Sequence, residues 1–361
     1  KMNIPGHETV MIFGGGYSTV QDVPDTAPQT DLRGKNLYIV DALTGQYLWS
    51  ALPPAVGPLA LLGTVDAPDI PGAAAGSIGL MNGVPNEVTA FDLDGDEYID
   101  HIYATDTMSQ VFRFDIDYTN SSIKGGRIAH LNLPDATNNR RFYNAPDVSA
   151  VRLREGSFIS VGIGSGYRAH PLNETVTDYY FLLQDKGVLT GIFDMDAGLG
   201  DLADVTDVVG DVDGNGISDA SELINDPLLN LKGWYIGFPR VGEKVISRSI
   251  TFNNAIIFTT YTPPSPTAAV CDAVAGTSRI YGMKVTDGNP YIDTNYDAQL
   301  SALDRSMTLT TSGIAPQPQV LLEGTGTGVK ARLCVGNICG LEKFLPEPPQ
   351  GVMGIRWRKN N

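Results

Sequence analysis

The sequence predicts an all-β protein, and three observations carry that prediction. Helical periodicity is nearly absent along the 361 residues. Short β-branched or aromatic runs recur instead, each followed by a turn rich in Asp, Gly, Asn or Pro. The 40 glycines and 23 prolines can supply those turns. Because each strand–turn–strand unit would bury little surface alone, we expect a β-propeller of about seven blades of roughly 40–50 residues, with a two-sheet sandwich as the alternative.

A strand–turn–strand pattern repeats along the chain. Residues 37–49, LYIVDALTGQYLW, place an alternating strand, an Asp, a Thr-Gly turn and a second strand ending on Trp49. Residues 280–292, IYGMKVTDGNPYI, repeat this arrangement with an Asp-Gly turn, and residues 111–123 and 179–193 are looser copies. We therefore expect two consecutive strands in each of these segments.

One acidic segment interrupts this rhythm. Residues 185–226 contain eleven acidic residues and one lysine, a local charge of −10, and the rest of the chain carries only −6. The stretch ASELI at 220–224 is expected to form a short helix. Length alone would suggest two domains, but closed β architectures run long as single units. We expect one propeller domain over residues 1–361, with an acidic insertion at about 185–226.

The charge balance limits the partners of the chain. Its 25 basic and 41 acidic residues give a net charge of −16, which opposes contact with nucleic acid or anionic lipid. No run approaches the roughly 18 consecutive apolar residues of a membrane-spanning helix. We expect no nucleic-acid partner and no membrane insertion. Since the chain begins at Lys1 without a signal segment, we expect it to be a piece of a longer protein.

The cysteines indicate one disulfide. Cys334 and Cys339 flank VGNI, whose central Gly-Asn turn would place them opposite each other at a non-hydrogen-bonded pair, with Cα atoms about 4.5 Å apart. The alternative is two reduced thiols on a hairpin. Cys271 is left over, and three cysteines do not make a zinc cluster of the CxxC…CxxC type.

A first acidic loop, FDLDGDEYID at 91–100, has the spacing of a calcium site. Counted from Asp92 as position 1, its aspartates stand at positions 1, 3, 5 and 9. Calcium prefers six to eight oxygen ligands in a flexible arrangement. The loop departs from an EF-hand, because glycine is at position 4 and position 12 is Tyr103. The alternative is a solvated acidic turn. The candidate ligands are Asp92, Asp94, Asp96, the carbonyl of Tyr98, and Asp100.

A second acidic loop, DVDGNGISDASE at 211–222, matches the EF-hand template over twelve residues. Gly216 takes the sharp turn at position 6, and Glu222 at position 12 can bind bidentately. No strong amphipathic helix precedes the loop, so a complete EF-hand pair is not expected, and the alternative is a flexible acidic insertion. The candidate ligands are Asp211, Asp213, Asn215, the carbonyl of Ile217, Asp219 and Glu222.

Catalytic motifs find little support in the sequence. The glycines of VGIGSGYRAHPL lack the later glycine and the βαβ unit of a dinucleotide site. Ser165 is not in a GxSxG register, and His170 belongs to no recognisable triad. The four histidines show neither HExxH nor His-x-His spacing. We therefore expect no catalytic residues and no enzymatic activity.

A set of longer motifs resembles one family. In order, they are FGGGY with NLYIVDALTGQYLW, FDLDGDEYIDHIYATDTMSQVFRFDI, GSGYRAHPL with TDYYFLLQD, GWYIGFPRVGEKVISRSITFNNAIIFTTYTP, and GIRWR. Over nearly its whole length the chain resembles the C-terminal β-propeller domain of the PilY family, proteins associated with type IV pili. The resemblance implies a modified seven-bladed propeller that follows a more variable N-terminal region.

The resemblance also implies a function. It implies calcium in the first loop, linked to the balance of pilus extension and retraction, and a role in pilus assembly and surface adhesion. The expected partners are minor pilins or other pilus-tip components and a host or abiotic surface. The expected location is extracellular, at the pilus tip or the outer membrane of a bacterium, reached through the periplasm. The second acidic loop is not part of the family pattern, and no RGD tripeptide is present.

Two other functions stay open at this point. LYIVDALTGQYLW also resembles the blade motif of quinoprotein dehydrogenases, which would use pyrroloquinoline quinone. Such enzymes tend to repeat a docking tryptophan in each blade, whereas this chain has three tryptophans. A purely structural extracellular propeller, in which one or two calcium ions only stabilise loops, is the other alternative.

Overall fold

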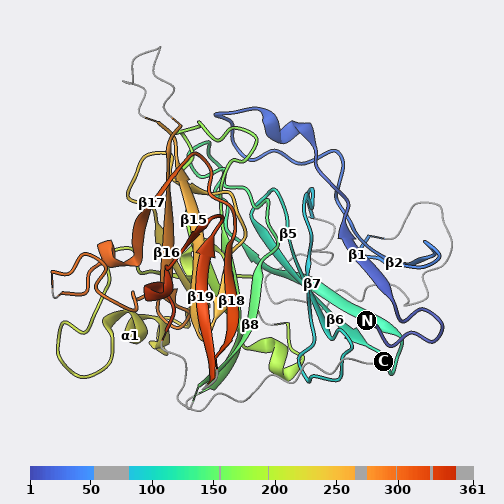
Figure 1. Cartoon of the computed structure of the whole chain (residues 1–361). Helices are drawn as coiled ribbons and strands as arrows, with labels where there is room; N and C mark the ends of the chain where they lie inside the picture. The colour runs from blue at the N-terminus through green and yellow to red at the C-terminus, as the bar shows by residue number, and fades with distance from the viewer. Residues whose placement is uncertain are drawn as a thin grey trace.

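The computed structural model describes residues 1–52, 81–153, 156–193, 195–264, 275–297, 299–325 and 328–346. These residues form five β-sheets, each built from strands that follow one another in sequence (Figure 1). The first sheet contains β1 (Val10–Gly14), β2 (Leu37–Asp41) and β3 (Tyr47–Ser50). The second contains β4 (Thr89–Phe91), β5 (His101–Thr105), β6 (Gln110–Asp117) and β7 (Ser122–His130).

The remaining three sheets follow in the same way. The third has the order β11-β12-β10-β9-β8, from β8 (Asp147–Leu153), β9 (Gly156–Gly164), β10 (Tyr179–Asp185), β11 (Ala203–Asp204) and β12 (Gly233–Gly237). The fourth contains β13 (Lys244–Val245), β14 (Ile250–Phe252), β15 (Ala255–Thr262), β16 (Thr277–Lys284) and β17 (Ser306–Ser312). The fifth contains β18 (Pro318–Thr325), β19 (Gly328–Val335) and β20 (Ile338–Cys339).

Helices are short in the described residues. The α-helix α1 (Asp219–Asn225) begins after Ser218, whose side chain accepts the N–H of Ser221, and it confirms the short helix expected at 220–224. The 3-10 turns are η1 (Thr19–Asp22), η3 (Gly187–Thr190), η4 (Leu199–Asp201), η5 (Ala302–Arg305) and η6 (Glu342–Phe344). None of the helices in the described part of the chain is long and apolar enough to cross a membrane.

In the described part of the chain, successive sheets stack face to face around four apolar cores. The strand residues of each core come from two neighbouring sheets, from the first and second through to the fourth and fifth, and residues of loops and short helices complete the cores. On β5, Tyr103 enters the core shared with the third sheet, while Ile102 enters the core shared with the first. Because successive side chains of a strand point to opposite faces, such a strand is apolar on both sides.

The stacking confirms the all-β class and does not fit a two-sheet sandwich. The five sheets belong to the described residues, whereas about seven blades were expected, so the blade number stays a prediction. Residues 37–49 and 111–123 form the expected strand pairs, β2 with β3 and β6 with β7.

Two of the expected strand pairs are absent from the described structure. Residues 280–284 belong to β16, but residues 285–292 form no second strand, and only an isolated bridge joins Pro290 to Met283. Residues 179–193 form β10, but the turn η3 replaces the second strand. The cause is tertiary, since Asp185 binds the buried Arg113 of β6 at 2.7 Å and also accepts the N–H of Val188, which enters the core between the second and third sheets.

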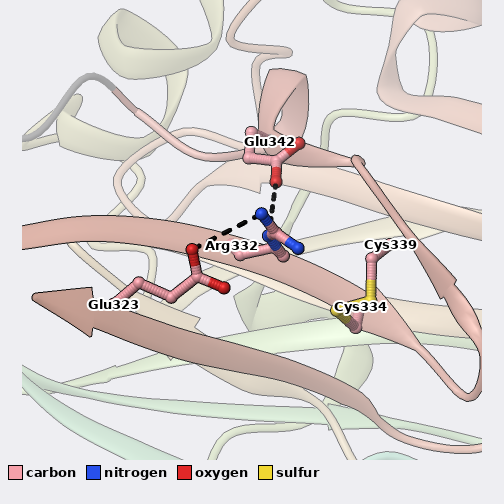
Figure 2. The surroundings of a disulfide bond; sticks show 5 residues. All are labelled: Glu323, Arg332, Cys334, Cys339 and Glu342. Atoms are coloured by element: carbon pink, nitrogen blue, oxygen red, sulfur yellow. Dashed lines mark ion pairs between the residues drawn. A yellow bond between two sulfur atoms is a disulfide. The ribbon is translucent and has the colours of Figure 1, made fainter. Parts of the chain in front are cut away.

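The predicted disulfide is present. Cys334 and Cys339 pair across β19 and β20 with Cα atoms 4.1 Å apart and are joined by a disulfide (Figure 2). Arg332 lies nearby between Glu323 and Glu342, at 3.4 and 4.0 Å. Cys271 lies outside the described residues.

Candidate calcium sites

The first acidic loop connects β4 to β5 at the edge of the second sheet. The N–H of Asp100 donates to the carbonyl of Phe91, and the carbonyl of Asp100 accepts the N–H of Ile116 on β6. The loop is therefore closed by β4 and β5 and tied to β6. Strands flank it on both sides, where an EF-hand has helices.

Three of the four expected carboxylates of this loop gather. Asp92, Asp94 and Asp100 each offer an oxygen, and these oxygens lie within 4.8 Å of one another. The carboxylate of Asp96 is not in this group and accepts the N–H of Tyr98 at 2.8 Å.

The second acidic loop precedes α1 and gathers a matching set. Asp211, Asp213 and Asp219 again bring three carboxylate oxygens within 4.8 Å of one another. The amide of Asn215 donates to Glu222 at 2.8 Å and to Asp213 at 3.2 Å. Asn215 therefore links the expected position-12 ligand to the acidic group.

The two loops share one hydrogen-bonding pattern although their sequences differ. In each loop the position-1 aspartate accepts N–H groups from positions 4 and 6, and the position-9 aspartate accepts the one from position 2. The side chains at positions 3 and 5 accept from positions 5 and 7. In the first loop the acceptors, at 2.7–3.0 Å, are Asp92, Asp94, Asp96 and Asp100. In the second, at 2.7–3.1 Å, they are Asp211, Asp213, Asn215 and Asp219.

The loops also share their backbone turns. Positions 4 and 6 have positive φ in both: Gly95 at 84° and Glu97 at 76° in the first, Gly214 at 76° and Gly216 at 91° in the second. The absence of glycine at position 6 of the first loop is therefore a departure from the EF-hand in sequence but not in backbone conformation. Glu97 adopts a conformation that disfavours residues with a Cβ atom.

The grouped oxygens fit a calcium ion. Calcium binds oxygens at 2.3–2.6 Å, so two ligands on opposite sides of one ion can lie up to about 5.2 Å apart. The groups of Asp92 and Asp211, whose oxygens lie within 4.8 Å of one another, satisfy that limit. The N–H of Gly216 lowers the pKa of the Asp211 carboxyl below its usual value. An ion would offset the mutual repulsion of these carboxylates.

The second loop is anchored to the fourth sheet by residues that its own sequence does not indicate. The hydroxyls of Ser218 and Ser221 both donate to Asp287 at 2.9 Å. The N–H of Gly210 donates to the side chain of Asn289 at 3.1 Å. These partners follow β16, about seventy residues along the chain, so only the folded structure brings them together.

One solved structure matches this fold over most of the chain. The C-terminal domain of Pseudomonas aeruginosa PilY1 has a TM-score of 0.55 and 17% sequence identity, and the match covers 91% of this chain and 68% of that one. The chain has the fold of the PilY1 C-terminal domain. This result confirms the fold class expected from the resemblance to the PilY family, and the number of blades stays a prediction.

Other comparisons add no functional argument. A quinohemoprotein alcohol dehydrogenase from Comamonas testosteroni has a TM-score of 0.34 at 12% identity, covering 92% of this chain and 43% of that one. An endo-arabinanase from Bacillus licheniformis has a TM-score of 0.21 at 11% identity, covering 69% and 88%. No protein-family model matches the sequence, and no curated protein matches it.

Proposed function

We propose that this chain is the noncatalytic, calcium-binding propeller of a type IV pilus-associated protein of the PilY family. The observation that carries the proposal is the similarity of its fold, over 91% of the chain, to the PilY1 C-terminal domain. In this proposal the protein acts in pilus assembly, in the balance of extension and retraction, and in adhesion. Its partners are pilus-tip components such as minor pilins and a host or abiotic surface, and its location is the pilus tip or the outer membrane.

The first loop is the proposed regulatory element. An ion held by Asp92, Asp94 and Asp100 would neutralise a cluster that lies where β4, β5 and β6 are tied together. Loss of the ion would restore repulsion between the carboxylates and loosen this corner of the second sheet. Extracellular calcium modules bind at about 10⁻⁴–10⁻³ M, so occupancy would respond to the surroundings.

The test uses the full-length protein in its own bacterium. Asp100→Ala removes a grouped carboxylate, whereas Asp96→Asn is a matched control, because asparagine already holds position 5 of the second loop. We expect Asp100→Ala to change the number of surface pili and to reduce attachment, and Asp96→Asn to change neither.

Two outcomes would favour the alternatives. A lower melting temperature in Asp100→Ala with unchanged pili and attachment would support a purely structural propeller. Dye reduction after addition of pyrroloquinoline quinone to the purified domain would support a dehydrogenase. We expect no such turnover.

A further inference from the structure

Two apolar rows on neighbouring sheets both end in arginine. On β16, alternate residues share the face toward the third sheet, and this row is Met283, Tyr281 and Arg279. The facing row begins on β12 of the third sheet and continues into the segment after that strand. It consists of Trp234, Ile236, Phe238 and Arg240. The apolar members pack in the core between the third and fourth sheets, so each arginine follows directly where that core ends.

A cavity of about 490 Å³ opens at this place. Ile236, Pro239, Tyr281 and Met307 give it apolar walls, and residues of η5 and β17 line its other side. Its volume is in the range of small-molecule sites.

The guanidinium group of Arg279 has neutral partners only in the described part of the chain. It donates to the hydroxyl of Ser306 at 3.1 Å, to the carbonyl of Ser306 at 3.4 Å and to the hydroxyl of Thr308. No acidic side chain of the described residues forms an ion pair with it.

Arg240 is held from behind by a buried acid. One carboxylate oxygen of Glu243 accepts a hydrogen bond from an Nη of Arg240 at 3.2 Å. Its other oxygen accepts hydrogen bonds from the hydroxyls of Tyr281 and Thr260. The side chain of Arg240 is still 35% exposed, and it lines the cavity together with Arg279.

The described lining of the cavity has more basic than acidic side chains, although the whole chain is strongly acidic. Its described lining contains three arginines and a single acid, Asp207, against a net charge of −16 for the chain. Burial lowers the pKa of Arg279, and the charge of Arg240 lowers it further, so the two cations repel each other. The third, Arg305, is engaged by four backbone carbonyls. A bound anion would relieve the repulsion between Arg240 and Arg279.

We propose that this cavity binds a small ligand carrying an oxyanion, a carboxylate or a phosphate, with Arg240 and Arg279 as its charged hydrogen-bond donors. The planar forks of guanidinium groups match both oxyanions, and the apolar walls would contact the body of the ligand. The site uses none of the proposed calcium ligands, so it is independent of the proposed function.

Isothermal titration calorimetry on the purified domain tests this proposal. The probes are D-glucuronate for the carboxylate and inorganic phosphate, with D-glucose as a neutral reference. Chelators are left out of the buffer, because EDTA is itself a polycarboxylate. We expect saturable binding of one or both anions, which identifies the preferred group, and none of D-glucose.

Variants locate the binding. Arg279→Gln and Arg240→Gln should each weaken binding about tenfold or more, since each removes charged hydrogen bonds. Arg152→Gln, at an exposed position of β8, should leave binding unchanged. If Arg279→Gln does not fold, the partly exposed Arg240 still provides the test. Absence of saturable binding of both anions, or equal binding by all variants, would overturn the proposal.

Discussion

Replacing Asp100 by alanine should remove one calcium-binding event and leave a second one intact. The carboxylate of Asp100 belongs to the first acidic group, and its second role is to accept the N–H of Leu93 at 2.7 Å. The variant therefore loses a metal ligand and a hydrogen bond. Loss of the hydrogen bond should lower the free energy of unfolding by about 1 kcal/mol even when no calcium is present. Glu222→Ala should instead remove the event assigned to the second loop.

The size of the effect follows from mass action. At a calcium concentration one hundred times the Kd, each site adds about 2.7 kcal/mol to the free energy of unfolding, so two independent sites add about 5.4 kcal/mol. Asp100→Ala and Glu222→Ala should each halve the calcium-dependent part. Calorimetric titration counts the events, and urea unfolding with and without calcium measures the stabilisation. Two unchanged binding events in Asp100→Ala would refute the assignment of the first loop, and two in Glu222→Ala that of the second.

Three further predictions concern the scaffold. Gly216→Ala should lower the free energy of unfolding by about 1–2 kcal/mol in urea unfolding, because its φ is 91° and an added Cβ would meet no neighbour, so the cost comes from the backbone alone. Gly200→Ala is the control, since that position is equally open but has no positive φ, and it should be nearly neutral. Equal effects of the two substitutions would contradict this. Burial raises the pKa of Asp178 from 3.8 to about 6, so the folded state favours the protonated carboxyl. The contribution of this group to the free energy of unfolding is therefore present below about pH 4 and is lost as the pH rises through about 6. Over this pH range the free energy of unfolding of Asp178→Asn should rise by about 3 kcal/mol relative to wild type, and a constant difference across pH would disprove it. Replacing Cys334 and Cys339 by serine should cost about 2 kcal/mol in the same assay, near the low end for disulfides because the closed loop is short, and no loss would contradict the entropic argument.

The fold was predictable from the sequence where local pattern and tertiary environment agree. Residues 37–49 and 111–123 form strand pairs, and both segments place apolar residues in the core between the first and second sheets. Val111 also enters the core between the second and third sheets. Residues 179–193 break the pattern because Asp185 turns inward to the buried Arg113, and no local signal marks a partner that lies 72 residues away.

The candidate calcium sites were predictable in outline. The spacing of aspartates predicted both loops, but it did not show that Asp96 stands apart from the first group or that Glu97 takes the turn of a glycine. Both features depend on backbone conformation. The anchoring of the second loop by Asp287 depends on contacts across the fold.

The sequence by itself determined the all-β class, the two acidic loops and the Cys334–Cys339 hairpin, because each of these depends on residues close together in the chain. Only the tertiary structure decided which carboxylates meet and that two arginines from neighbouring sheets share one cavity. The physical reason is that stacking of sheets, driven by burial of their apolar faces, sets distances between residues that local spacing does not encode.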